Sequence, residues 1–202
     1  MTAPRIRHPY FAVWLIVAGI IGWWAAFQLT IEKFVLLADP SSELGCDFSV
    51  LVQCGANLNS PQGAVFGFPN PIIGLTGWMA PIVVGAALLA GARFRRWFWL
   101  LFGVGMTGAL AFVAWLIGQS IFVLNTLCPW CMVTWAVTIP TFFATMVHIF
   151  REGAVPISSS ARRRAEKWMT WVPLMTIAGF AVIAVLAQIR LDWLAEIARL
   201  FA

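Results

Sequence analysis

The sequence predicts an all-α membrane protein with a four-helix transmembrane bundle, a fifth transmembrane helix and an outer loop that contains a surface half-helix. Hydrophobic residues make up 61% of the 202 residues and charged residues only 10%, with a mean hydropathy of +0.88. This composition is too apolar for a soluble globular domain. The charged residues also divide the chain into apolar segments of about 20 residues, the length that a helix needs to cross a bilayer.

Five spans are expected between these charged residues. The second should begin at Pro71, because proline suits the first turn of a helix. The run from Trp97 to Phe150 contains no Asp, Glu, Lys or Arg and is long enough for two spans. Its polar residues 118–120 and 125–126 predict the turn between them. The five spans are predicted over residues 10–31, 72–92, 97–117, 128–150 and 168–189.

These spans predict the domain organisation. Residues 1–150 form the four-helix core, with the outer loop at 32–70. Residues 151–167, rich in serine and arginine, form a cytoplasmic linker, and residues 168–202 form the fifth span with a short tail that could be an interfacial helix. The first apolar segment is too long for the hydrophobic region of a cleaved signal peptide, so we expect it to remain as a span.

The distribution of lysine and arginine predicts the orientation. Basic residues gather in the cytoplasmic connections of membrane proteins. Ten lie on the side of the N-terminus and three on the other. We therefore expect a multi-pass protein of the inner or plasma membrane, with a cytoplasmic N-terminus and all four cysteines at the extracytoplasmic face. The net charge of +5 indicates no nucleic-acid binding, because the basic clusters flank spans.

The four cysteines form two pairs. Cys128 and Cys131 are spaced as C-x-x-C at the start of a predicted helix, which puts them one turn apart on one face, where they can form a readily reduced disulfide. Cys46 and Cys54 are separated by seven residues of the outer loop. A thiol on that loop can attack a C-x-x-C disulfide and pass electrons inward.

Other interpretations of the cysteines remain open at this point. Cys46 and Cys54 could form a static structural disulfide, and Cys128 and Cys131 could be two small buried hydrophobic residues. A zinc site is disfavoured, because the seven-residue gap exceeds the usual two to four residues between ligands. We expect no metal.

The electron acceptor must come from the membrane. The sequence has no haem-ligand pair, no dinucleotide-binding glycine pattern and no array of iron–sulfur cysteines. A diffusible lipid-soluble acceptor such as a quinone is left.

The order of these motifs resembles the vitamin K epoxide reductase family, in its bacterial branch. The matching features are Cys46, Cys54, Ser60 with Pro61 as a helix start, the run from Phe68 to Gly74, and Cys128 with Cys131. The resemblance covers about residues 13–150. Bacterial members resembling this chain oxidise a thioredoxin-like (DsbA-like) protein outside the cytoplasm and reduce a membrane quinone.

The resemblance implies a role for each cysteine. Cys131 would lie next to the quinone, and Cys128 would exchange with the loop. Cys54 would attack Cys128, while Cys46 would meet the partner protein. Because the chain stops at Ala202 without a fused thioredoxin-like domain, the partner is expected to be a separate protein.

The resemblance also implies quinone contacts. Asn70 would hydrogen-bond a carbonyl of the quinone, menaquinone or ubiquinone, although an asparagine before Pro71 is also a common helix N-cap. Ser60 would start the half-helix. Trp135 occupies the position of a tyrosine in mammalian members, and Trp135 and Phe66 are expected to line the quinone pocket, although aromatic residues of membrane proteins are often interface anchors.

Two alternative functions remain open. A DsbB-type thiol oxidase has the same logic on four spans, but its C-x-x-C usually lies in the first outer loop, whereas here it follows the second. The other alternative is a non-enzymatic membrane or transport protein stapled by disulfides. Transporters usually carry ionisable residues within their spans, and these spans contain only His148, near an end.

Overall fold

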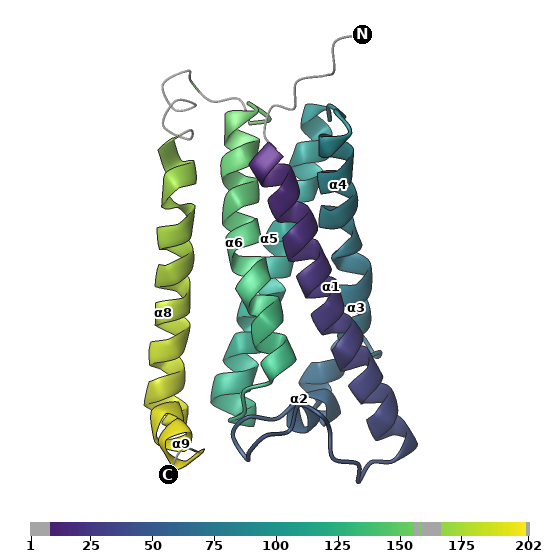
Figure 1. The fold of residues 1–202 in the computed structure, drawn as a ribbon, viewed down its shortest axis with the longest axis vertical. Helices are drawn as coiled ribbons and strands as arrows, with labels where there is room; N and C mark the ends of the chain where they lie inside the picture. Colours follow the sequence, from purple (N-terminus) through teal and green to yellow (C-terminus); the bar gives the residue numbers. More distant parts are fainter. Residues whose placement is uncertain (1–8, 156–157, 159–166, 201–202) are drawn as a thin grey trace.

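The computed structural model describes residues 9–155, 158 and 167–200. Within these residues, five helical segments are long and apolar enough to cross a membrane, which confirms the predicted all-α membrane fold (Figure 1). They are α1 (Pro9–Ala38), α3 (Pro71–Gly77) with α4 (Met79–Leu89), α5 (Arg96–Gly118) with the π-helix η2 (Gln119–Leu124), α6 (Pro129–Arg151), and η3 (Met169–Trp171) with α8 (Val172–Leu191). Three short helices, α2 (Gly55–Asn59), η1 (Pro61–Ala64) and α9 (Trp193–Leu200), complete the described elements.

Helix α1 contacts α3 and α4 on one side and α6 on another, and α5 packs against α6. Small residues allow the close approach, as is common between membrane helices. A Cβ atom added at Gly22 would lie 2.2 Å from the Trp78 ring, and one added at Gly85 would lie 2.6 Å from the Ala12 carbonyl oxygen. Glycine is therefore required where α1 meets the α3–α4 segment.

Helix α8 lies at the edge of the bundle beside α6 (Figure 1). In the most apolar 18-residue stretch of this span only 17% of the residues are buried, against 61% in the corresponding stretch of α6. The predicted linker 151–167 lies mostly outside the described residues. The short tail helix is present as α9, which begins after Asp192, a residue with a left-handed backbone (φ 48°).

Two expected boundaries were wrong. Helix α1 does not end at Ile31, because Lys33 remains helical and donates to the Leu58 carbonyl oxygen (2.8 Å) and to Asn59 Oδ1 (3.2 Å). The polar residues 118–120 do not form a turn, because α5 continues through them as η2. The buried Ser120 hydroxyl donates to the Thr126 carbonyl, and the chain turns at Asn125, which has a left-handed backbone (φ 53°).

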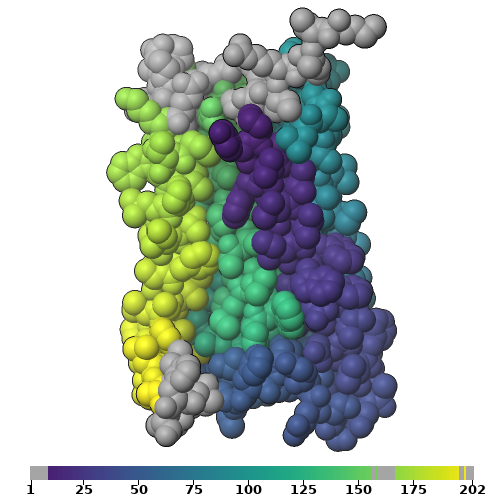
Figure 2. Space-filling view, viewed as in Figure 1, coloured from purple at the N-terminus to yellow at the C-terminus, as the bar shows by residue number. Residues whose placement is uncertain are grey.

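The connection between α1 and α3 lies across one end of the bundle, opposite the start of α1 (Figure 1). We call residues 39–70 the outer loop. In the space-filling view the loop, in blue, covers the N-terminal end of α6, in green (Figure 2). All four cysteines lie in this loop or at the start of α6.

Candidate active site

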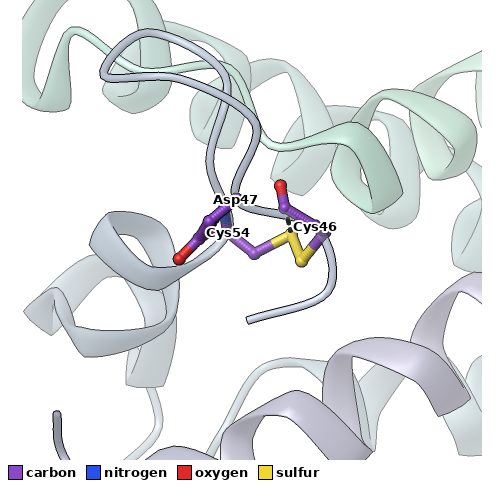
Figure 3. A group of neighbouring side chains, drawn as sticks. All are labelled: Cys46, Asp47 and Cys54. Carbon is purple, nitrogen blue, oxygen red and sulfur yellow. Dashed lines mark hydrogen bonds between the residues drawn. A yellow bond between two sulfur atoms is a disulfide. The ribbon is translucent and has the colours of Figure 1, made fainter. Parts of the chain in front are cut away.

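A disulfide joins Cys46 and Cys54 in the outer loop, with a Cα–Cα distance of 5.7 Å. The Asp47 carboxylate fixes the backbone beside it (Figure 3). Its Oδ1 atom accepts hydrogen bonds from the amides of Cys54 (2.6 Å) and Gly55 (3.1 Å). Both cysteines are buried, packed in a cluster that also contains Leu29 and Leu36 of α1 and Cys128.

A short parallel bridge connects the outer loop to the segment before α6, pairing Val52 with Leu127. The Gln53 amide donates to the Leu127 carbonyl (3.0 Å), and the Leu127 amide donates to the Leu51 carbonyl (2.7 Å). This register brings the cysteines that follow the bridge side by side. The Sγ atoms of Cys54 and Cys128 lie 3.6 Å apart.

The second pair occupies the first turn of α6. Cys128 is the N-cap, Pro129 follows at the first helical position, and Cys128 Sγ accepts a hydrogen bond from the Cys131 amide (3.4 Å). Both are free thiols. Cys128 is fully buried, packed with Cys54 and leucines of the outer end of the bundle, whereas Cys131 is partly exposed.

Cys131 opens onto a cavity of about 210 Å³ between η1, α3, α5 and α6. The 3-10 helix η1 is the half-helix expected from the sequence. The walls are mainly apolar and include Phe112, Val113 and Trp135. Cys128 is not among the lining residues. The four sulfurs therefore form a series that leads from the loop disulfide through Cys128 to the cavity.

The chain matches the model of the Vitamin K epoxide reductase family over residues 13–146, more than half of its length. The chain belongs to this family. A comparison with curated proteins gives no match. Membership makes the chain a membrane oxidoreductase of a family of quinone-linked thiol oxidoreductases, in agreement with the disulfide and the two thiols at the site.

The cavity fits the quinone that membership in the vitamin K epoxide reductase family implies. The cavity combines apolar walls with the Cys131 thiol and a few side-chain amides. One of these amides has a buried oxygen, Gln62 Oε1, that has no hydrogen-bond partner among the residues described by the structure. A quinone ring is flat and apolar with two oxygens at its edge, so it requires these features.

Ser60 starts the half-helix, as predicted for this family member. Its Oγ atom accepts a hydrogen bond from the Gly63 amide (3.1 Å) as the N-cap of η1, and it donates to the Asn57 carbonyl (2.8 Å). Ser60 also lines the cavity. Pro61 occupies the first helical position.

Asn70 lines the cavity, but its side chain holds the half-helix. Asn70 Nδ2 donates to the backbone carbonyl of Gln62 (2.6 Å), and Asn70 Oδ1 accepts from the backbone amide of Val65 (3.1 Å). Asn70 occupies the N-cap position of α3, as expected, but its side chain makes no hydrogen bond that caps the helix. In this family member Asn70 connects the half-helix to the start of α3.

The two aromatic residues differ in position. Trp135 is buried and lines the cavity. Phe66 is 64% exposed and is not among the lining residues, although its ring lies 6.1 Å from that of Phe112, which is one of them. Its contact with a quinone remains a prediction.

Sequence reasoning missed Asp47, Gln62 and Gln119. Gln62 and Gln119 both line the cavity, and Gln62 Nε2 donates to Gln119 Oε1 (3.3 Å). Gln119 is one of few polar residues in a long apolar run, which is a signal that sequence reasoning assigned to a turn instead. Asp47 had no signal beyond its place next to Cys46.

The Cys46, Asp47 and Cys54 side chains offer ligand atoms within 4.8 Å of one another. The two sulfurs share a disulfide, and a disulfide provides no thiolate. Because thiolate is the form that binds metal, the oxidised group is a redox centre and not a metal site.

Proposed function

We propose that this family member oxidises a separate thioredoxin-like (DsbA-like) protein at the extracytoplasmic face and reduces a membrane quinone, menaquinone or ubiquinone, in support of disulfide bond formation. The observation that carries the proposal is the series of sulfurs. Cys54 Sγ lies 3.6 Å from Cys128 Sγ, and Cys131, one turn further, lies in the cavity wall.

The outer pair receives electrons first. A thiolate of the partner attacks Cys46 Sγ, which breaks the Cys46–Cys54 bond and frees Cys54. The partner's second thiol then resolves the mixed disulfide, so the partner is oxidised and the loop pair is reduced. Each exchange moves two electrons and leaves the number of disulfides unchanged.

The inner pair receives electrons from Cys54. The Cys54 thiolate attacks Cys128 Sγ of a Cys128–Cys131 disulfide and releases Cys131, and Cys46 then attacks Cys54 and frees Cys128. The state in the structure, with the outer pair oxidised and the inner pair reduced, is the product of this transfer. The two electrons and two protons for a quinone then come from the Cys128 and Cys131 thiols together, whose disulfide re-forms as the quinone is reduced.

A quinone, when bound, accepts two electrons and two protons. The cavity residues hold it against Cys131 and exclude water with apolar side chains such as Val113 and Trp135. Asn70 keeps the half-helix over the cavity. Its second Nδ2 hydrogen is the donor that we assign to a quinone carbonyl, and Ser60, Trp135 and Phe66 complete the proposed surroundings.

The proposed orientation puts the start of α1 in the cytoplasm. Two observations support it. The basic residues favour the N-terminal side ten to three, and the outer loop lies at the opposite end of the bundle from the start of α1 (Figure 1). The cysteines would then face the compartment in which disulfides form.

Quinone reduction by the purified protein in detergent tests the function, with a reduced thioredoxin-like donor and with wild type and Cys131→Ser in parallel. We expect turnover in the wild type and background rates in the variant, because the last thiol of the series is absent. Wild-type protein without turnover on menaquinone or ubiquinone, and with a Cys46–Cys54 bond that resists mild reductant, would favour a static structural disulfide.

A further inference from the structure

Two glutamines from elements far apart in the sequence meet in the wall of the cavity. Gln62 belongs to the half-helix η1, and Gln119 begins the π-helix η2. Both line the cavity beside Cys131. Their amides are joined by a hydrogen bond from Gln62 Nε2 to Gln119 Oε1 (3.3 Å).

This amide pair has unused hydrogen-bonding capacity. Gln62 Oε1 is buried and has no hydrogen-bond partner among the residues that the structure describes. Gln119 Nε2 likewise donates no hydrogen bond within this part of the chain, where the Gln119 side chain only accepts. Since buried polar atoms in proteins are almost always hydrogen-bonded, the orphaned Gln62 oxygen indicates a missing partner.

The other polar side chains of the cavity are engaged in the fold. Asn57 donates to Thr126 Oγ1 (3.0 Å), and Ser60 bonds to two backbone groups. Asn70 uses its oxygen and one amide hydrogen to hold the half-helix. Thr134 and Thr138 donate to backbone carbonyls of their own helix. Among the described residues that line the cavity, the glutamine pair is the amide group that combines a buried acceptor without a partner with a free N–H donor.

On the basis of the proposed function, we propose that the Gln62–Gln119 pair binds one ring oxygen of the quinone in both of its redox states. A quinone carbonyl only accepts hydrogen bonds, whereas a hydroquinone hydroxyl also donates one. An amide pair has an N–H donor for the first and a C=O acceptor for the second. Rotation of both amides reverses the direction of their mutual hydrogen bond, so that either residue can provide the free donor while the other provides the free acceptor.

The pair therefore controls the relative affinity for substrate and product. A site with donors alone would leave the O–H of the hydroquinone without an acceptor and so favour the quinone, and a site with acceptors alone would retain the product. The glutamine pair binds both forms with similar strength, which lets the hydroquinone leave after reduction. A carboxylate at position 62, which only accepts, should favour the hydroquinone.

Equilibrium binding in the Cys131→Ser background, where turnover is blocked, tests this inference. A short-chain ubiquinone, and its hydroquinone under anaerobic conditions, are titrated by quenching of tryptophan fluorescence, because Trp78 and Trp135 line the cavity. Gln62→Leu and Gln119→Leu should each weaken binding of both forms about fivefold, the usual effect of losing one hydrogen bond. Gln62→Glu should raise the ratio of the quinone Kd to the hydroquinone Kd about tenfold.

Gln53→Leu is the matched control, because Gln53 lies on the outer loop, donates to the Val50 carbonyl and does not line the cavity. It should bind both forms like the parent. If Gln62→Leu fails to fold, as judged by size-exclusion chromatography, Gln119→Leu and Gln62→Glu carry the test. Variants that keep the parent's affinities for both forms would overturn the role of the pair while leaving the proposed function intact. A parent that binds neither form would overturn both.

Discussion

The Cys46–Cys54 pair lies in an irregular loop, whereas the Cys128–Cys131 pair occupies the first turn of a long helix. The inner pair is held locally, since the geometry of the α6 N-terminus puts Cys131 N 3.4 Å from Cys128 Sγ. The outer pair depends on side-chain and bridge contacts, above all those of Asp47 and the pairing of Val52 with Leu127.

Under the proposed function, this difference separates two tasks. A pair on a helix stays at a fixed place beside the cavity, which suits a thiol that must meet the same small molecule in every cycle. A pair on a loop can be displaced when its few contacts open, as exchange with a protein partner requires. The 3.6 Å approach of Cys54 to Cys128 is where the two tasks meet.

The largest expected effect comes from removing Cys46. In Cys46→Ser, the Cys54 thiol has lost its disulfide partner and lies beside Cys128, so oxidation should convert most molecules to a Cys54–Cys128 disulfide. Peptide mapping by mass spectrometry without reduction detects this bond directly. With a protein donor, quinone reduction should fall to background.

Cys54→Ser is the matched control for this trap. It leaves Cys46 as the loop thiol, and the sulfur that contacts Cys128 in the structure is gone. We expect little Cys46–Cys128 disulfide under the same oxidation. Equal yields of the two cross-links would contradict the assigned order of the thiols.

The helices were predictable because each depends on neighbouring residues. Apolar length between charged residues located all five spans, a proline located the start of the second, and the start of α6 at Pro129 agrees with the expected span from 128. The errors have a tertiary cause. Lys33 stays helical because the outer loop has acceptors for its ammonium group, and Gln119 remains in a helix because η2 forms part of the cavity wall.

The site was predictable in its residue types and less so in its contacts. Spacing identified both cysteine pairs and the Ser60 cap. The approach of Cys54 to Cys128 spans a sequence separation of 74 residues and depends on the register of one bridge, which neither segment specifies alone. Asn70 was expected to cap α3 or to bind quinone, and its bonds to the half-helix could not be foreseen, because they require the folded loop.

The next largest effect is expected at Asn70, which connects the loop to the cavity. Asn70→Ala removes the hydrogen bonds to the Gln62 backbone carbonyl and the Val65 amide, so the half-helix keeps only the backbone hydrogen bond from the residue-70 amide to the Gly63 carbonyl (2.8 Å) at this point. The loss of two such bonds should raise the KM for quinone about tenfold. Steady-state kinetics with a short-chain quinone measure the change.

Asn59→Ala is the matched control for Asn70. Asn59 is an exposed asparagine at the end of α2 that accepts from Lys33 and does not line the cavity, so its KM for quinone should stay near the wild-type value. Asn70→Asp keeps the acceptor for the Val65 amide only and should fall between. A wild-type KM in Asn70→Ala would show that the half-helix needs no such attachment.

A smaller effect is expected at Asp47, which positions the outer cysteine pair and not the inner one. Asp47→Ala leaves the Cys54 and Gly55 amides without their carboxylate, which should cost about 1 kcal/mol and slow thiol exchange between the pairs about fivefold. Stopped-flow measurement of quinone reduction after adding reduced partner reports this rate. Asp39→Ala is the control, since the Asp39 carboxylate accepts hydrogen bonds from the amide and the hydroxyl of Ser41 in the same loop. An equal slowing in Asp39→Ala would assign the effect to the loss of a negative charge from the loop.

The smallest effect is expected at Phe66, which distinguishes the loop surface from the cavity wall. Phe66 is 64% exposed and packs on Phe68 and Phe112, whereas Phe112 itself lines the cavity. Removing a mostly exposed ring removes little buried area, so Phe66→Ala should change the KM for quinone less than about twofold, while Phe112→Ala should raise it several-fold. A larger effect at Phe66 than at Phe112 would mean that the half-helix closes over a bound quinone and brings Phe66 into contact with it, which would restore the contact that the family resemblance implies.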